Sequence, residues 1–388
     1  MRGANGAVAA HLSAGLDSAI VTATAGRLLG AGRVTAFTAA PSEAFATDPD
    51  DPWISDESGL AARLAATQDN IDHIIIRGDG TSPIAGMARD FFFQQQPTQS
   101  PLNAVWGRAI SKEASSRKLG ILLSGGGGNF TATYSGVEAI PEMLARGSLL
   151  SFLRGLRSLH RGGRTRSSSI AAAAFPLLPD AAWRTASQIW RRPRGLTEYA
   201  AIAKHSVASL EADAAKAGWR PDFPPRRDPV KTRIDGLSRT DGANFYKGVL
   251  AEWGLSIREP LLDLRLVRLC LAIPPDEYLI PDRPRDLARR SFADRLPPAL
   301  LAEQRRGLQA ADWAQGASVA VGEVREELTF ARRTAGLADV VDLNQLEADA
   351  EALASVDLSS EDDELRFQVR LLGGIATTYF ARRTAGTN

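Results

Sequence analysis

Residues 6–19, "GAVAAHLSAGLDSA", contain the stretch that decides the fold. A short apolar run is followed by a loop of small and polar residues and then by a helix-like segment. Small residues let the backbone approach an anion, and the first amides of a helix point toward it. Two serine hydroxyls can donate to phosphate oxygens, and Asp17 suits such a loop if a cation bridges it to the phosphate. The alternative is a plain turn in which Asp17 or Ser18 caps the helix.

Similar apolar runs recur through the first third of the chain. Residues 33–39, 72–77 and 119–124 are strand-like, and helix-compatible segments cover 17–30, 56–67 and 101–118. Apolar strands that alternate with helices predict an α/β fold with a parallel sheet of about five strands and helices on both faces. Ligands of such sheets bind beyond the carboxyl ends of the strands. The loops that begin at Ser13, Ala40 and Ser124 are therefore the candidate site.

From about residue 138 the pattern becomes mostly helical. Segments with helical periodicity cover 198–218, 240–252, 263–272, 283–294, 317–330 and 363–382. The heptad "FARRTAG" occurs at 330–336 and again at 380–386. Nothing similar surrounds the two copies, so we interpret them as helix ends of like composition.

Composition restricts the possible partners. The 388 residues carry a net charge of +1, which gives no overall attraction to nucleic acid or to a membrane. The N-terminus does not resemble a secretory signal, and no apolar run is long enough for a membrane span. The single cysteine, Cys270, excludes an internal disulfide framework and a cysteine-based metal cluster, and in its apolar segment it is expected to be a packed thiol. These features predict a cytoplasmic protein with no nucleic-acid or membrane partner.

One region departs from this balanced charge. Residues 146–169, "RGSLLSFLRGLRSLHRGGRTRSSS", include six arginines, and no acidic residue occurs between Glu142 and Asp180. The simpler interpretation is an amphipathic helix with a solvated basic face, followed by a flexible loop. The alternative is a docking patch for an acidic peptide or partner.

The loop at 13–18 resembles the pyrophosphate loop of the N-type ATP pyrophosphatases, and in particular that of the asparagine synthetase family. Four further stretches are similar to motifs of that family and occur in the same order: "VTAFTAAP", "LLSGGGGNF", "REPLLDLRLVRLCLAIPPDEYL" and "LPPALLAEQRRGLQ". On these motifs the chain is identified as a member of the family. The resemblance implies one synthetase domain over 1–388, in which a nucleotide-binding α/β core (1–137) is completed by a mainly helical part (138–388).

The resemblance also implies the chemistry. Such enzymes use ATP and Mg²⁺ to adenylate a carboxylate, which an amine then attacks to form an amide. Asp17 would be catalytic and bind the metal, and Arg305 aligns with a lysine that neutralises charge in the transition state. The residues implied in binding ATP and pyrophosphate are Ser13, Ala14, Gly15, Leu16, Asp17, Ser18, Ala39 at the adenine near Thr38, Ser124 and Gly125.

Several positions depart from the family pattern. Ala14 and Gly126 replace a glycine and a carboxylate, Asn129 replaces a second metal-binding aspartate, and Phe130 replaces the acid that often follows. One certain carboxylate is left for Mg²⁺, which can suffice when phosphate oxygens and water complete the shell. Asp263 matches a family aspartate, although it could simply cap the next helix.

The function implied is an ATP-dependent, asparagine-synthetase-like ligase without a glutaminase domain in this chain. Its carboxylate substrate would be aspartate or a peptide Asp/Glu side chain, and a glutaminase or a precursor peptide could act as a partner in trans. One alternative is a lasso-peptide macrocyclase, in which the peptide's own N-terminus is the amine. Another is a catalytically degenerate nucleotide-binding protein, which the residues at 126, 129 and 305 favour.

Overall fold

The computed structural model describes residues 7–48, 50–161, 173, 175–179, 181–182, 185, 195–219, 228–279, 283–353 and 361–386. Its strands are β1 (Ala7–His11), β2 (Arg33–Ala40), β3 (Trp53–Ile54), β4 (Ile71–Arg77), β5 (Ile121–Leu123), β6 (Ser256–Arg258) and β7 (Arg306–Gly307). The helices of the first half are α1 (Leu16–Leu29), α2 (Ser58–Ala65), α3 (Met87–Gln94), α4 (Pro101–Ser116), α5 (Ile140–Ala145) and α6 (Leu149–Arg161). Those of the second half are α9 (Leu196–Tyr199), α10 (Val207–Lys216), α11 (Pro229–Ser238), α12 (Ala243–Trp253), α13 (Leu264–Ala272), α14 (Asp286–Ser291), α15 (Pro298–Ala302), α16 (Trp313–Arg333), α17 (Leu343–Ala352), α18 (Glu361–Glu364) and α19 (Leu372–Thr384).

The main sheet is parallel, with the strand order β4-β2-β1-β5-β6. The predicted parallel sheet of five strands is therefore confirmed. Four strands come from the expected segments, while β6 comes from the mostly helical half of the chain and pairs with β5. The sheet edge is thus completed by residues about 130 positions after β5.

Helices cover both faces of this sheet, as predicted. One face packs on α1 and α2 through a cluster that includes Val8 and Leu64, and α13 to α15 extend this cluster. The other face packs on α4 and α12 through Phe37, Ile110 and Val249. The apolar side chains on both sides explain why the strands lack the alternation of a half-exposed sheet.

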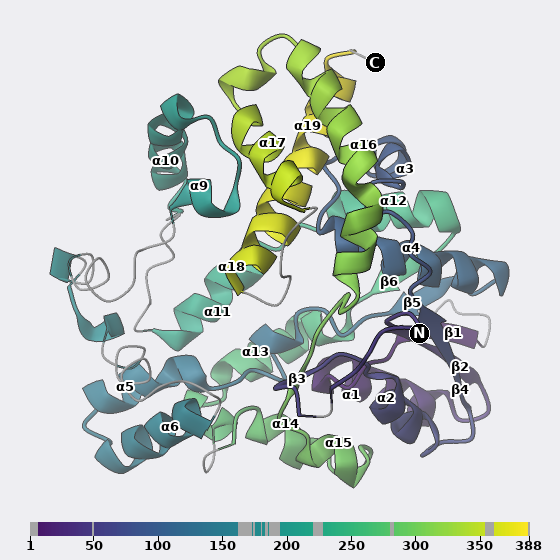
Figure 1. Cartoon of the computed structure of the whole chain (residues 1–388). Helices are drawn as coiled ribbons and strands as arrows, with labels where there is room; N and C mark the ends of the chain where they lie inside the picture. The colour runs from purple at the N-terminus through teal and green to yellow at the C-terminus, as the bar shows by residue number, and fades with distance from the viewer. Residues whose placement is uncertain are drawn as a thin grey trace.

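The C-terminal helices form a cluster of their own. Helices α16, α17 and α19 lie together at the top of Figure 1, and their apolar core also includes Met87 of α3 and Leu102 of α4. A buried ion pair joins Arg382 of α19 to Glu327 of α16, with Nη2 and Oε2 2.7 Å apart. Both "FARRTAG" copies end helices, α16 at Arg333 and α19 at Thr384, as predicted.

Three segments differ from the sequence prediction. Residues 198–218 do not form one helix, because the chain leaves α9, forms an antiparallel bridge between Ile202 and Val341, and only then enters α10. The segment 283–294 is helical only over α14, and 363–382 includes a π-helical stretch over Leu365–Leu371. In the described part of the chain, none of the helices combines the length and apolar character needed to cross a membrane.

Candidate active site

The loop between β1 and α1 is stabilised by hydrogen bonds of its two serines, Ser13 and Ser18. The Ser13 amide donates to Ser18 Oγ at 3.0 Å, the two serine hydroxyls lie 2.8 Å apart, and the Gly15 amide donates to Ser13 Oγ at 3.0 Å. Gly15 is the N-cap of α1, so Asp17 and Ser18 lie inside the first turn and do not cap the helix. Ala14 is not among the residues with positive φ, so its extra methyl group causes no backbone strain.

Asp17 is the main charged group at this end of the loop. Its carboxylate accepts a hydrogen bond from the hydroxyl of Thr133, a fully buried side chain. Burial raises the pKa of Asp17 above its ordinary value, while the Thr133 hydrogen bond and the positive charge of Arg285 oppose this shift. Asp17 is thus a buried carboxyl group whose anion is supported by the Thr133 hydroxyl, by its own backbone amide and by one nearby cation.

The four glycines pack against this loop. An ideal Cβ on Gly125 would lie 2.6 Å from the Ser18 amide nitrogen, and one on Gly128 would lie 2.0 Å from Asp17 Oδ1. A side chain at either position would displace the start of α1 or the Asp17 carboxylate. The glycine run therefore brings the end of β5 into contact with the loop after β1.

The replacement of an expected carboxylate by Gly126 has a local counterpart. An ideal Cβ on Gly126 would lie 2.1 Å from Oε1 of Glu259, so the Glu259 carboxyl group fills the space beside this glycine. Glu259 also accepts a hydrogen bond from the Tyr246 hydroxyl, which helps to raise the pKa of Tyr246 after the larger effect of burial. A carboxylate is therefore present next to position 126, although it comes from the segment after β6.

A second acid, Glu57, contacts the loop directly. The Ala14 amide donates to Glu57 Oε1 at 3.0 Å, and burial raises the pKa of Glu57. An ideal Cβ on Gly307 would lie 2.3 Å from the same carboxyl group. Glu57 thus joins the loop after β1 to strand β7, which pairs with β3.

These elements surround one cavity of about 420 Å³ at the carboxyl ends of the strands. A volume of this size is in the range of small-molecule sites. The expected residues that line it are Ser13, Gly15, Asp17, Ser18, Ala39, Ser124 and Gly125, together with Gly126 and Asn129. Ala14, Leu16 and Arg305 are not among the lining residues, and Leu16 is buried in the core under the sheet.

The wall of the cavity beside Ala39 is largely apolar. It is formed by residues such as Phe37, Ile76 and Trp106, and it includes the imidazole of His11. Burial lowers the pKa of His11 to about 4, and its buried Nε2 has no hydrogen-bond partner in the described structure. An apolar slot with one unpaired polar atom fits a nucleobase, which has both a flat face and polar edges.

Arg305, which the resemblance implied as catalytic, does not line this cavity. Its guanidinium forms a bidentate ion pair with the Glu303 carboxylate, with Nε–Oε1 and Nη2–Oε2 distances of 3.1 and 3.0 Å. Asp263, the other position aligned by motif, accepts from the Arg265 amide as the N-cap of α13, and its contact with Arg265 lowers its pKa to about 2. Its observed role is therefore the capping role.

Two further expectations concern individual residues. Phe130 packs outside the site against α11, where its ring fills the space over Gly236 and its carbonyl accepts from Arg233 Nε at 2.8 Å. Cys270 is 3% exposed, in agreement with the expected packed thiol. Of the basic region, the structure describes α6 up to Arg161, and the rest of that stretch lies outside the described residues.

Sequence reasoning missed several residues at this site. Glu57 stands near the start of a helix and resembled an ordinary helix-start acid, and Thr133 and Arg285 lie in no recognisable motif. The far wall of the cavity comes from Leu308 to Gly316 around the start of α16, including Asp312, whose Oδ2 accepts from the Ser42 amide at 2.9 Å. The motif "LPPALLAEQRRGLQ" reaches Leu308 and Gln309, but no sequence signal pointed to the rest of this wall.

The site can also be tested for a magnesium ion. Within the described ranges there is no cluster of three or more His, Cys, Asp or Glu side chains that could hold a metal. Among the acids on the cavity wall, Asp17 is the one expected from the sequence to bind the metal. Asn129, at the second expected position, offers only a neutral amide oxygen. This set fits a cation held mainly by phosphate oxygens and water, with Asp17 as its protein ligand.

Comparison with known proteins agrees with these features. A family model described as asparagine synthase matches residues 3–361. A search among curated proteins found no match. The match spans most of the chain, including the loop after β1, the glycine run and strand β7. The chain therefore belongs to the asparagine synthase family.

Proposed function

We infer that this chain is an ATP-dependent ligase of the amide-forming kind, which its membership of the family supports. We propose that this chain adenylates a carboxylate, aspartate or an Asp or Glu side chain of a peptide, and transfers the acyl group to an amine. A carboxylate oxygen would attack the α-phosphorus of ATP, and pyrophosphate would leave. The amine would then attack the acyl carbon, release AMP and lose a proton to solvent, so that one amide bond forms for each ATP cleaved.

The observation that carries this proposal is the meeting of two loops in one cavity. Ser13, Gly15 and Ser18 line the cavity at the start of α1, where the helix dipole favours an anion. Ser124 and Gly125 bring the end of β5 against that loop. A magnesium ion held by Asp17 would neutralise the phosphate charge and so make pyrophosphate a better leaving group.

Peptide macrocyclisation is a second candidate, favoured by helix α6. Leu149, Leu150 and Leu153 are 61%, 71% and 55% exposed, on a helix that also carries Arg154 and Arg157 and no acid. Exposed leucines beside arginines suit an acidic peptide with apolar side chains. In this variant the substrate would be such a peptide, and its own N-terminus would be the amine.

The test measures AMP release and exchange of labelled pyrophosphate into ATP. The purified chain receives ATP and Mg²⁺ with aspartate and ammonia, or with an acidic peptide that has a free N-terminus. Turnover with aspartate supports the first candidate, and turnover with the peptide alone supports the second. Binding of ATP with no AMP under any condition would reject both and support a nucleotide-binding protein without catalysis.

A pair of variants tests the placement of the site. Asp17→Ala should abolish AMP formation, because it removes the only acid assigned to the cation. Asp342→Ala is the matched control, since Asp342 caps the remote helix α17 by accepting from the Gln345 amide at 3.0 Å. Full activity of Asp17→Ala would show that the phosphate site lies elsewhere.

A further inference from the structure

Arg233 of α11 is a buried arginine, 1% exposed, whose charge is held by neutral groups. Its Nε donates to the Phe130 carbonyl at 2.8 Å, and its Nη2 donates to the Cys270 carbonyl at 3.0 Å. Among the described residues no carboxylate forms an ion pair with it, and its Nη1 has no hydrogen-bond partner. Burying such a charge is costly, and an apolar residue of similar volume often stabilises a fold as well. The two carbonyl contacts therefore explain this guanidinium better than stability does.

Two tyrosine rings enclose the guanidinium. Its central carbon lies 4.4 Å from the ring centroid of Tyr134 and 5.1 Å from that of Tyr278. The face of an aromatic ring attracts a cation, and here both rings are buried. The Tyr278 hydroxyl donates to the Cys270 carbonyl at 2.7 Å, so Arg233 and Tyr278 share one acceptor. Arg233 is thus fixed in one position, and so are the groups bonded to it.

The two carbonyl groups belong to segments that meet at the four glycines after β5. Phe130 follows the glycines along the chain. Cys270 lies in the last turn of α13, where carbonyl groups favour a cation. The residues that lead into α13 pack on the glycines, since the Glu259 carboxyl group fills the space beside Gly126. Arg233 therefore ties α11 to both segments that surround the glycines.

The turn after the glycines contains both Phe130 and Thr133, the donor to Asp17. Backbone hydrogen bonds of 2.9 to 3.1 Å within this turn make it compact. Arg233 holds the turn at two points, the Phe130 carbonyl and the Tyr134 ring. Thr133 lies between these points in the sequence, and its hydroxyl donates to Asp17. Because closely packed interiors transmit displacements, a shift of this turn should draw the hydroxyl away from Asp17.

We propose that Arg233 is a positioning residue of the site, which holds the turn 128–134 so that the Thr133 hydroxyl stays on Asp17. Its consequence for catalysis rests on the proposed function, because Asp17 serves the reaction as the ligand of the cation. The link from Arg233 to Asp17 is a property of the fold, and it can be measured with no nucleotide or metal present.

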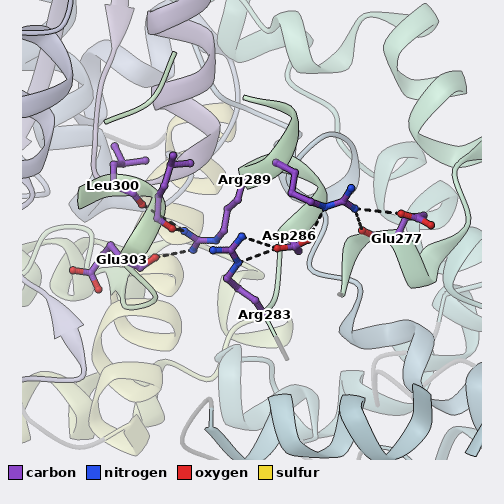
Figure 2. Close-up of polar contacts among 8 residues, drawn as sticks. Glu277, Arg283, Asp286, Arg289, Leu300 and Glu303 are labelled. Atoms are coloured by element: carbon purple, nitrogen blue, oxygen red, sulfur yellow. Dashed lines mark hydrogen bonds and ion pairs between the residues drawn. The ribbon is translucent and has the colours of Figure 1, made fainter. Parts of the chain in front are cut away.

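A second buried arginine, Arg289 of α14, provides a comparison. Figure 2 shows its guanidinium at the backbone carbonyls of Leu300 and Glu303, with Nη1–O and Nη2–O distances of 3.5 and 2.7 Å. Like Arg233, it donates to carbonyl groups at a helix end, here that of α15. Within the described part of the chain, its guanidinium has no hydrogen bond to the turn 128–134. Loss of Arg289 should therefore weaken the fold without moving that turn.

The first experiment is a double-mutant cycle followed by urea denaturation in EDTA. Thr133→Val should raise the unfolding constant of the wild type about tenfold, the loss of one buried hydrogen bond to a carboxylate. In an Arg233→Met background it should raise this constant less than about threefold, because the contact is already loosened. In an Arg289→Met background the full effect should remain, since distant sites are additive. Equal effects of Thr133→Val in the wild-type and Arg233→Met backgrounds would overturn the inference.

The second experiment measures ATP binding by calorimetry over a range of Mg²⁺ concentrations. Arg233→Met should raise the Mg²⁺ concentration at half-maximal binding roughly tenfold, as expected when a metal-binding carboxylate loses its orientation. Thr133→Val should act similarly, and the double variant should add less than about threefold to either. Tyr278→Phe removes the other donor to the Cys270 carbonyl and should stay within about twofold. An equally large change in Tyr278→Phe would reduce Arg233 to a general packing role and overturn the inference, as would an unchanged Mg²⁺ requirement in Arg233→Met.

Arg233→Lys takes the place of Arg233→Met if that variant does not fold. Lysine keeps the charge but lacks the planar fork that reaches both carbonyl groups, so the effect of Thr133→Val should again fall below that in the wild type. A wild type that binds no ATP at any Mg²⁺ concentration would instead overturn the proposed function. The cycle in EDTA would still decide whether Arg233 positions Thr133.

Discussion

The contact between Thr133 and Asp17 allows a sharp test of the electrostatics of the site. Thr133→Val keeps the shape of a fully buried side chain and removes the hydroxyl that donates to Asp17. A hydrogen bond to a charged group contributes about 1.5–3 kcal/mol, and one to a neutral group about 0.5–1.5 kcal/mol. The substitution should therefore lower the free energy of unfolding by the larger amount when Asp17 is ionised and by the smaller amount when it is protonated.

The sign of the pH dependence follows from the direction of the shift. Burial raises the pKa of Asp17 in the folded protein, so ionisation of Asp17 weakens the folded state as pH rises from the ordinary carboxyl pKa to the raised one. Thr133→Val removes a hydrogen bond that lowers the pKa of Asp17, so this pKa rises further in the variant. The loss of stability therefore continues to higher pH in the variant than in the wild type. The difference in stability between wild type and variant should therefore be larger at alkaline than at acid pH.

The measurement is urea denaturation of both proteins between pH 5 and pH 9, with binding of ATP and Mg²⁺ followed in parallel. Thr133→Ser keeps a hydroxyl and should stay close to wild type. Thr131→Val is a matched control, because the buried Thr131 hydroxyl donates to the neutral carbonyl of Gly127 at 3.1 Å. Its destabilisation should not change with pH. An equal loss at both ends of the pH range for Thr133→Val would refute the role of Thr133 in supporting the Asp17 anion.

Three further predictions concern contacts elsewhere in the protein. Glu57→Gln should tighten binding of pyrophosphate several-fold, because a negative charge leaves the phosphate loop; weaker binding in calorimetry would contradict this. Gly126→Ala should destabilise the protein by about 1–3 kcal/mol by overpacking against Glu259, and in a Glu259→Ala background most of this loss in urea denaturation should disappear. Glu327→Ala should cost about 3–5 kcal/mol in unfolding free energy because it removes the carboxylate that pairs with the buried Arg382 guanidinium, whereas a loss below 1 kcal/mol would show that solvent reaches the pair.

The sequence predicted the parallel sheet and the loop after β1 because both depend on local patterns. Apolar runs of strand length alternate with helical segments, and the Ser13 to Ser18 spacing is compact enough to recognise in one stretch. Strand β6 could not be predicted in the same way, since three residues with partial burial carry no periodicity. Its assignment depends on pairing with β5, which is a tertiary interaction.

The placement of arginines near the site shows a second limit of sequence reasoning. Arg305 and Arg306 are adjacent, and in an extended segment neighbouring side chains point to opposite sides. A motif can align with either residue, yet the structure commits Arg305 to Glu303 and brings Arg306 near Arg285. The positions of Glu57 and Glu259 could not be predicted either. Glu57 contacts Ala14 and Glu259 packs beside Gly126, and in each pair the two residues are far apart in the sequence.

The position of β6 at the edge of the sheet has a consequence for synthesis of the protein. When residues 1–137 have left the ribosome, β5 still lacks its outer neighbour, because that neighbour lies at 256–258. Unpaired strand edges invite association with other chains. The nascent chain therefore carries an open edge for more than a hundred residues of translation, and the wall formed by residues 308–316 arrives later still. A ligand cavity can close only when most of the polypeptide has been made, so an interrupted product would expose its sheet without a working pocket.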